Sequence, residues 1–219
     1  MFNNIQLKNY KQIPKPHSKQ DIFKVSIKDL HPTQMCVGLS EVWNRQADFL
    51  QESKSQRLRY LRNKPIPIVR NKGKELWILD RHHRLRALLE NDIESEAYGY
   101  LVSEVNNMGI DETLKFLGQQ GWLYLFDRQG NGPHSPKSLP QNLLEMEDDP
   151  YRSLVWKLKK EGVINPSPLT PYHEFHWGRW LRTRSLPPFD SRNLYPAISV
   201  AKKLACTKNA SHLAGWKGE

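Results

Sequence analysis

The stretch of residues 75–90 constrains the fold more than any other part of this chain. Residues 76–79 form an apolar run rich in strand-forming side chains, and the run ends at the acid Asp80. Polar residues follow at once, and leucines then recur at helical spacing over residues 84–90. This order predicts a strand, a tight polar turn and a helix. The junction between strand and helix holds Asp80, His82, His83 and Arg84.

A strand-to-helix junction of this composition suits an anion. The first turn of a helix presents backbone N–H groups without partners and a partial positive charge, and both favour phosphate. We predict that Arg81, His83 and Arg84 contact phosphate, since guanidinium groups match phosphate oxygens. We predict catalytic roles for Asp80 and His82, with Asp80 holding Mg²⁺ or orienting His82. The structural alternatives are a helix cap, hydrogen-bonded imidazoles and a salt bridge from Arg84.

Segments on both sides of the junction predict a mixed α/β domain over residues 21–105. Residues 1–20 are polar, rich in Lys and interrupted by two prolines, which predicts a flexible arm. A helical pattern runs from Ser40, the expected N-cap, to Leu61, and Pro65 ends it. A turn at residues 71–73 has the composition of a hairpin. Strands are expected at residues 25–30, 66–69, 76–79 and 97–102.

Residues 106–219 predict a mainly helical extension that packs on this domain. Asp111 is the expected cap of one helix, and Asp149 with Pro150 is typical of the start of another. Tryptophans and other aromatic residues of this part are expected in the core. A short strand is expected at residues 122–126. Helices are expected at residues 111–117, from 150 onward, at 171–183 and at 196–204.

The charge distribution favours an anionic partner. The chain carries a formal net charge of +10 and has a pI of about 9.6. Basic residues are concentrated between residues 54 and 86, around the strand-to-helix junction. This pattern fits a nucleotide, a phosphorylated small molecule or a nucleic acid, and a solvated basic surface is the plain alternative.

Other patterns exclude several classes of protein. No stretch approaches the ~20 apolar residues of a membrane helix, and no signal peptide is evident, so the expected location is the cytoplasm. Cys36 and Cys206 lie too far apart for a disulfide framework or a zinc cluster, and Cys36 is expected to be buried. His173 and His176 are spaced unlike a zinc-protease motif. Walker-type phosphate loops and serine-hydrolase elbows are also absent from the sequence.

The junction resembles the phosphate-binding turn of the ParB/sulfiredoxin superfamily, whose members carry a Gly-x-x-Arg-like motif there. Here the motif reads Asp-Arg-His-His-Arg-Leu-Arg-Ala over residues 80–87. Segments similar to the ParB-like nuclease family accompany it in the same order. The resemblance implies an α/β (α+β) fold: a ParB/sulfiredoxin-like mixed-sheet domain with a mainly helical C-terminal part. The similar segments are residues 27–34 with 37–38, 148–154, 174–177 and 212–216.

The resemblance also implies roles for individual residues. Arg84 matches the phosphate-binding arginine of the superfamily. His82 stands where sulfiredoxins place their catalytic cysteine, which argues against sulfiredoxin activity because that reaction needs a thiolate. Arg81 stands where relatives have glycine, a residue that lets a backbone approach phosphate closely. Arg81 either narrows this approach or adds a cation.

Residues 33–41 are candidates for the opposite wall of the site. Thr33 and Gln34 offer hydrogen bonds, and Gly38 is a further candidate for this phosphate-binding wall. Serine kinases of the superfamily use a carboxylate as a base toward a hydroxyl, and Glu41 is our candidate for that role. The structural alternative for Glu41 is an acid in the first turn of a helix, where the dipole favours it.

Three functions remain open from the sequence. The first is an enzyme that binds a nucleotide or phosphate ester and performs phosphoryl transfer or phosphate hydrolysis, with Mg²⁺ as the candidate cofactor. The second is a DNA-binding protein or nuclease of ParB-like type, although the helices after residue 150 do not read as a helix-turn-helix. The third is a non-catalytic module that binds a ligand.

Overall fold

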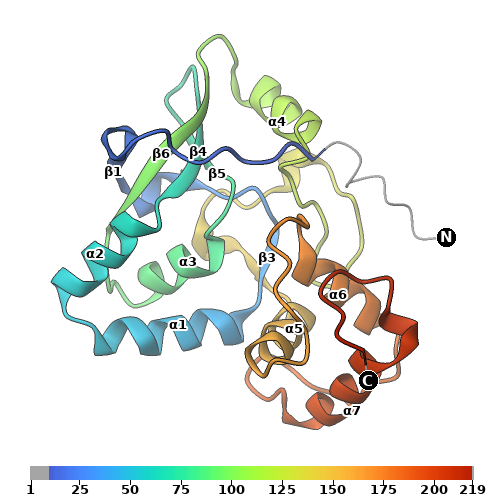
Figure 1. Ribbon diagram of the computed structural model, residues 1–219. Helices are drawn as coiled ribbons and strands as arrows, with labels where there is room; N and C mark the ends of the chain where they lie inside the picture. The colour runs from blue at the N-terminus through green and yellow to red at the C-terminus, as the bar shows by residue number, and fades with distance from the viewer. Residues whose placement is uncertain (1–9, 219) are drawn as a thin grey trace. The chain divides into compact units, whose positions relative to one another are not determined.

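The computed structural model describes residues 10–218, which divide into two compact units interleaved along the chain. The first unit consists of residues 10–35, 42–126 and 132–146. The second consists of residues 36–41, 127–131 and 147–218. The mixed α/β class predicted from the sequence is confirmed (Figure 1). None of the helices in residues 10–218 is long and apolar enough to cross a membrane.

The first unit is built on a five-stranded mixed sheet. Its strands are β1 (Phe23–Ser26), β2 (Leu30–His31), β4 (Ile66–Asn71), β5 (Leu76–Ile78) and β6 (Glu96–Val105). The order across the sheet is β1-β6-β4-β5-β2. The pairs β1–β6 and β4–β5 are antiparallel, whereas β4–β6 and β2–β5 are parallel. The hairpin predicted between β4 and β5 is confirmed.

The connection between β1 and β2 makes this sheet curl. These two strands lie at opposite ends of the strand order, yet only the 3₁₀ turn η3 (Ile27–Asp29) joins them. Three residues span at most ~10 Å, whereas the edges of a flat five-stranded sheet lie ~19 Å apart. The two edges must therefore approach each other. The single strand predicted over residues 25–30 is wrong for this reason, because the chain changes edges in its middle.

Four helices accompany the sheet: α1 (Leu39–Gln51), α2 (Lys54–Asn63), α3 (His82–Glu90) and α4 (Ile110–Gln119). The first three residues of α1 belong to the second unit. A single helix was predicted where α1 and α2 stand, but Ser53 begins a new helix with a capping box to Gln56. Ser40 lies inside α1 and Asp111 inside α4, so both predicted caps are wrong. Asp148 accepts from the N–H of Leu39 instead, and Gly109 precedes α4.

The N-terminal segment and residues 122–126 pair differently from the predictions. The predicted arm lies partly in residues 1–9, outside the described residues. Lys11 donates to the carbonyl of Gln120 and accepts from the indole of Trp122, and Tyr100 donates to Pro14. Residues 122–126 form no sheet strand in the described structure and make only an isolated bridge from Tyr124 to residue 34.

The second unit is mainly helical. Its helices are α5 (Pro150–Lys160), α6 (His173–Arg182) and α7 (Tyr195–Cys206), and a short parallel pair joins β3 (Cys36–Val37) to β7 (Glu147–Asp148). Trp177 is fully buried in its core, and Asp149 caps α5 with Pro150 at the first position, as predicted. The second unit also contains the 3₁₀ turn η6 (Lys208–Ala210). The first unit contains the 3₁₀ turns η2 (Lys19–Asp21), η4 (Pro136–Ser138) and η5 (Leu143–Glu145).

Gly38 lies against the backbone of α5. A Cβ atom placed on Gly38 would lie 2.7 Å from the backbone nitrogen of Ser153 and 3.0 Å from the carbonyl carbon of Arg152. Backbone atoms cannot move aside as a flexible side chain can. The absence of a side chain at Gly38 therefore allows close packing of α5 within the second unit, and the predicted role of Gly38 in phosphate binding stays a prediction.

We expect the variant Gly38→Ala to lose roughly 1–3 kcal/mol of unfolding free energy, because the added methyl group overlaps backbone atoms. Gly118→Ala is the matched control, since a Cβ on Gly118 in α4 meets its nearest neighbour at 3.7 Å. That variant should gain about 0.5–1 kcal/mol from helix propensity. Urea unfolding followed by circular dichroism measures both changes. Equal stability of the two variants would contradict this role for Gly38.

Candidate functional site

The junction between β5 and α3 adopts a backbone that favours glycine. Arg81 precedes α3 with φ +79° and ψ 12°, in the left-handed region. Asp80 stabilises this turn twice: its Oδ1 accepts from the N–H of Arg81 at 2.7 Å, and its Oδ2 pairs with the guanidinium of Arg81 at 2.9 Å. The turn thus has a backbone shape that glycine adopts without strain, and here it carries a cation.

The start of α3 is not capped by a side chain. The first helical hydrogen bond runs from Leu85 to the carbonyl of Arg81. Helix α3 begins two residues before the predicted start at Arg84, since His82 and His83 are its first residues. The N–H groups of His82, His83 and Arg84 therefore precede the hydrogen-bond ladder of the helix.

His82 is buried and holds the start of α3 against the loop that follows β2. Its Nε2 accepts from the N–H of Thr33 at 3.1 Å, so the ring proton belongs on Nδ1. Thr33 also donates its hydroxyl to the carbonyl of Ile78 at 2.7 Å. Burial lowers the pKa of His82 to about 4, and the nearby charge of Asp80 opposes that shift. His82 is therefore neutral at pH 7.

Arg84 carries a buried guanidinium that the protein satisfies only in part. Its Nη1 donates to the carbonyl of Lys64 at 3.1 Å, and its charge lies 4.9 Å from the centre of the Tyr60 ring. Its Nε is buried and has no hydrogen-bond partner within the described residues. Neither of the predicted salt bridges forms, because Glu90 pairs with Arg86 and Asp80 with Arg81.

The guanidinium groups of Arg45, Arg81 and Arg84 form what we call the arginine cluster. Burial lowers the pKa of Arg84 to about 10, Tyr60 and Asp80 raise it, and Arg81 and Arg45 lower it further. Arg81 and Arg45 therefore both lie within electrostatic reach of Arg84. Such mutual repulsion favours an added anion.

Solvent reaches this junction at Asp80 and Arg81. Their side chains are 54% and 36% exposed, whereas Arg84 is 6% exposed. Two phenols lie near this ion pair. Burial raises the pKa of Tyr10 and of Tyr100, Arg81 lowers the pKa of Tyr100, and Asp80 raises both pKa values. A ligand would meet the exposed ion pair first and the buried guanidinium beneath it.

The remaining predicted site residues fall in three places. Thr33 contacts His82, and Gln34 and His83 are both buried in the first unit. Gly38 and Glu41 belong to the second unit. Roles in phosphate binding or catalysis for these residues stay predictions.

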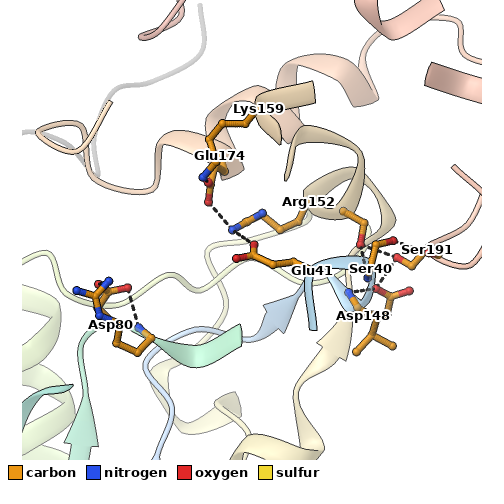
Figure 2. Close-up of polar contacts among 11 residues, drawn as sticks. Ser40, Glu41, Asp80, Asp148, Arg152, Lys159, Glu174 and Ser191 are labelled. Atoms are coloured by element: carbon orange, nitrogen blue, oxygen red, sulfur yellow. Dashed lines mark hydrogen bonds and ion pairs between the residues drawn. The ribbon is translucent and has the colours of Figure 1, made fainter. Parts of the chain in front are cut away.

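Glu41 is part of a buried ion network in the second unit. Its Oε2 accepts from Nη2 of Arg152 at 2.9 Å, and that guanidinium also pairs with Glu174 (Figure 2). Glu174 pairs with Lys159 as well. The side chains of Glu41 and Arg152 are 6% and 5% exposed. A base role for Glu41 would require this pair to open.

Sequence reasoning missed Arg45 and Tyr60. Both sit on helices that were predicted as one, and neither stands within the Gly-x-x-Arg-like motif. The available signal was weak, since Arg45 is one of many cations and Tyr60 lies among basic residues of α2. Their proximity to Arg84 follows from the tertiary structure.

Comparison with known proteins identifies the family. A family model described as "Putative ParB-like nuclease" matches residues 23–183. The chain belongs to this ParB-like family. The predicted resemblance is therefore confirmed, and the matched range contains both the β5–α3 junction and the Glu41 network.

A solved structure resembles this ParB-like chain over most of its length. The crystal structure of protein Atu1540 from Agrobacterium tumefaciens superposes with a TM-score of 0.79 at 28% sequence identity. The similarity covers 90% of this chain and 98% of that one. No curated protein matches the sequence.

The neutral state of His82 predicts a pH dependence of stability. Between pH 6.5 and 4 the unfolded histidine binds a proton that the folded one does not, so stability rises with pH across this window. Above pH 6.5 the stabilisation is complete, and below pH 4 it is lost. The shift corresponds to about 3 kcal/mol.

The variant His82→Gln should flatten this dependence, because a glutamine Oε1 can accept from Thr33 without titrating. His173 and His176 also have lowered pKa values, caused first by burial, and are unchanged in the variant. Urea unfolding at pH 4, 5, 6 and 7 gives the comparison. Parallel stability curves for the two proteins would show that His82 is not the group responsible.

Proposed function

We propose that this ParB-like protein binds the phosphate of a nucleotide or phosphate ester at the start of α3 and performs phosphoryl transfer or phosphate hydrolysis there. The observation that supports it is the arginine cluster beside an uncapped first turn. Arg84 and Arg81 lie within three residues of each other on this turn, and Arg45 joins them from α1. These are the two elements of anion recognition: fixed N–H donors and guanidinium groups.

A phosphate would satisfy what the protein leaves incomplete. The Nε of Arg84 is a buried donor without a partner, and a buried donor of this kind costs ~1–3 kcal/mol. Asp80 is the acidic group that acts on Arg84, and Arg81 and Arg45 act on it as cations. An anion bound at this point would offset both costs, so binding would stabilise the folded protein.

Mg²⁺ fits this site only with help from the ligand. In the described residues no group of three or more His, Cys, Asp or Glu side chains could hold a metal ion. Mg²⁺ is commonly held by one or two carboxylates with phosphate oxygens and water. Asp80 is the carboxylate at the junction, and it would have to give up part of its pairing with Arg81. A bound Mg²⁺ would neutralise charge on the phosphate.

The chain's own residues would act by positioning and charge stabilisation. Arg81 and Arg84 would bind phosphate oxygens, and the first N–H groups of α3 would orient them. His82 would keep this turn in place through its hydrogen bond to Thr33. A direct catalytic role for His82 would require that hydrogen bond to break.

The same junction suits a phosphodiester, and this supports nuclease activity as the second candidate. A phosphodiester presents the same non-bridging oxygens to arginine and to a helix terminus. Membership of a ParB-like nuclease family and a net charge of +10 support it. A metabolite-binding module without catalysis would use the site in the same way and show no turnover.

We expect nucleotides with Mg²⁺ to raise the melting temperature of the protein, and Arg84→Ala to weaken that binding by about 10- to 100-fold, since charged hydrogen bonds contribute ~1.5–3 kcal/mol. A thermal-shift titration measures the change. Arg84→Lys keeps the charge but loses the planar fork, so its binding should be intermediate. Arg70→Ala is the control, because it removes a guanidinium from a surface ion pair with Glu104.

Two results would contradict the proposal. One is a wild-type protein whose melting temperature no nucleotide changes. The other is an Arg84→Lys variant that melts like the wild type and binds nucleotide equally well.

A further inference from the structure

We infer that the exposed side of α2 is a docking surface for duplex DNA, next to the arginine cluster. This surface, the α2 face, is defined by five exposed residues. It goes beyond the proposed function because none of these residues belongs to the β5–α3 junction. The α2 face consists of Ser55, Gln56, Arg59, Arg62 and Asn63.

Helical spacing places these residues on one side of α2. They recur at intervals of three and four residues, so their side chains project in similar directions. Leu61, which is 2% exposed, lies on the opposite side and packs into the core of the first unit. The α2 face therefore points to solvent while the helix is anchored from behind.

No acidic residue close in sequence balances the positive charge of α2. No Asp or Glu occurs between residues 53 and 74, and α2 carries Lys54, Arg57, Arg59 and Arg62. Pairs of like charges three residues apart repel each other slightly, and Lys54 at the first helical position opposes the helix dipole. Arg57 donates to the carbonyls of Phe49 and Glu52. Arg59 and Arg62 are exposed and can meet an external anion.

Arg62 is held in position by its neighbours. Its guanidinium lies 5.9 Å from the centre of the Tyr98 ring on β6. A cation held against an aromatic ring loses less freedom when it binds a phosphate than a mobile one does. Ordered cations of this kind suit a repeated anionic surface.

The composition of the α2 face favours DNA over a membrane. A membrane-binding helix needs large apolar side chains beside its cations, and the α2 face has none among its five residues. Arg, Asn, Gln and Ser bind phosphate oxygens and base edges instead. An α-helix of ten residues is ~15 Å long and fits the major groove of duplex DNA.

Helix α2 also contacts the predicted phosphate site. Arg84 donates to the carbonyl of Lys64, directly after the end of α2, and lies over the ring of Tyr60 within α2. If the proposed function holds, a DNA strand that docks on α2 brings its phosphates toward the arginine cluster. The docking itself does not depend on that function.

Fluorescence anisotropy with a labelled ~20-base-pair duplex tests the surface. The variant R59Q/R62Q removes two cations from the α2 face, and K72Q/K74Q removes two exposed cations from the β4–β5 turn as a matched control. We expect R59Q/R62Q to bind at least about tenfold more weakly and its log–log salt slope to fall by about 1.8. The control should differ little from wild type.

Three outcomes would overturn the inference: no duplex binding by the wild type, equal losses in both double variants, or tighter binding to the single strand of the same sequence. Nucleotide thermal shifts on R59Q/R62Q separate this inference from the proposed function. Weak DNA binding with a normal nucleotide shift supports the α2 face. Normal DNA binding by R59Q/R62Q rejects it and leaves the nucleotide site unaffected.

Discussion

The buried guanidinium of Arg84 is the constraint on which the β5–α3 junction depends. A cation in this position loses solvation, and the first unit returns only a backbone carbonyl, an aromatic ring and the field of Asp80. The positive charges of Arg81 and Arg45 repel the guanidinium of Arg84 and lower its pKa. The protein thus maintains a site whose charge is under-compensated in the absence of a ligand, which is the electrostatic condition that an anion-binding site requires.

The fold places this guanidinium through two features. Strand β2 pairs in parallel with β5, so the loop after β2 lies beside the start of α3, where Thr33 donates to His82. The left-handed backbone of Arg81 then turns the chain sharply from β5 into α3. Asp80 stabilises that turn through both of its carboxylate oxygens, so the acid predicted to be a ligand also has a structural role.

In the second unit, carboxylates compensate the charge of the buried guanidinium. Arg152 receives two carboxylates, from Glu41 and Glu174. The Nε and Nη1 of Arg152 also lack hydrogen-bond partners within the described residues, so the two arginines differ in charge compensation and not in unsatisfied donors. Because carboxylates pair with Arg152 and none pairs with Arg84 in residues 10–218, we propose phosphate binding for Arg84.

Local sequence patterns predicted the parts of the fold that local interactions determine. The hairpin at residues 71–73, the strand before Asp80 and the Asp149–Pro150 helix start are all decided by neighbouring residues. The failures come from tertiary contacts. Ser40 was a plausible cap, but Asp148 from a distant part of the chain takes that role. The strand over residues 25–30 divides because its halves pair with β6 and β5.

In the candidate site, too, the local motif was predicted and the tertiary contacts were not. The motif of residues 80–87 identified the family and the junction. It did not predict that His82 would be a buried acceptor for Thr33, since that depends on how β2 pairs with β5. Arg45 and Tyr60 lie more than 20 residues before Arg84, and no spacing rule connects them. Glu41 was proposed as a base only because it carries a carboxylate. Its pairing with Arg152, 111 residues away in the sequence, could not be predicted from local patterns.

A crystal structure of the protein soaked with a nucleotide and Mg²⁺ tests the central claim most directly. The account predicts a phosphate group whose oxygens lie within hydrogen-bonding distance of the Arg84 guanidinium and of the first N–H groups of α3. It also predicts that the Nε of Arg84 gains the partner it now lacks. A nucleotide bound elsewhere, with Arg84 still unpartnered at Nε, would contradict the account.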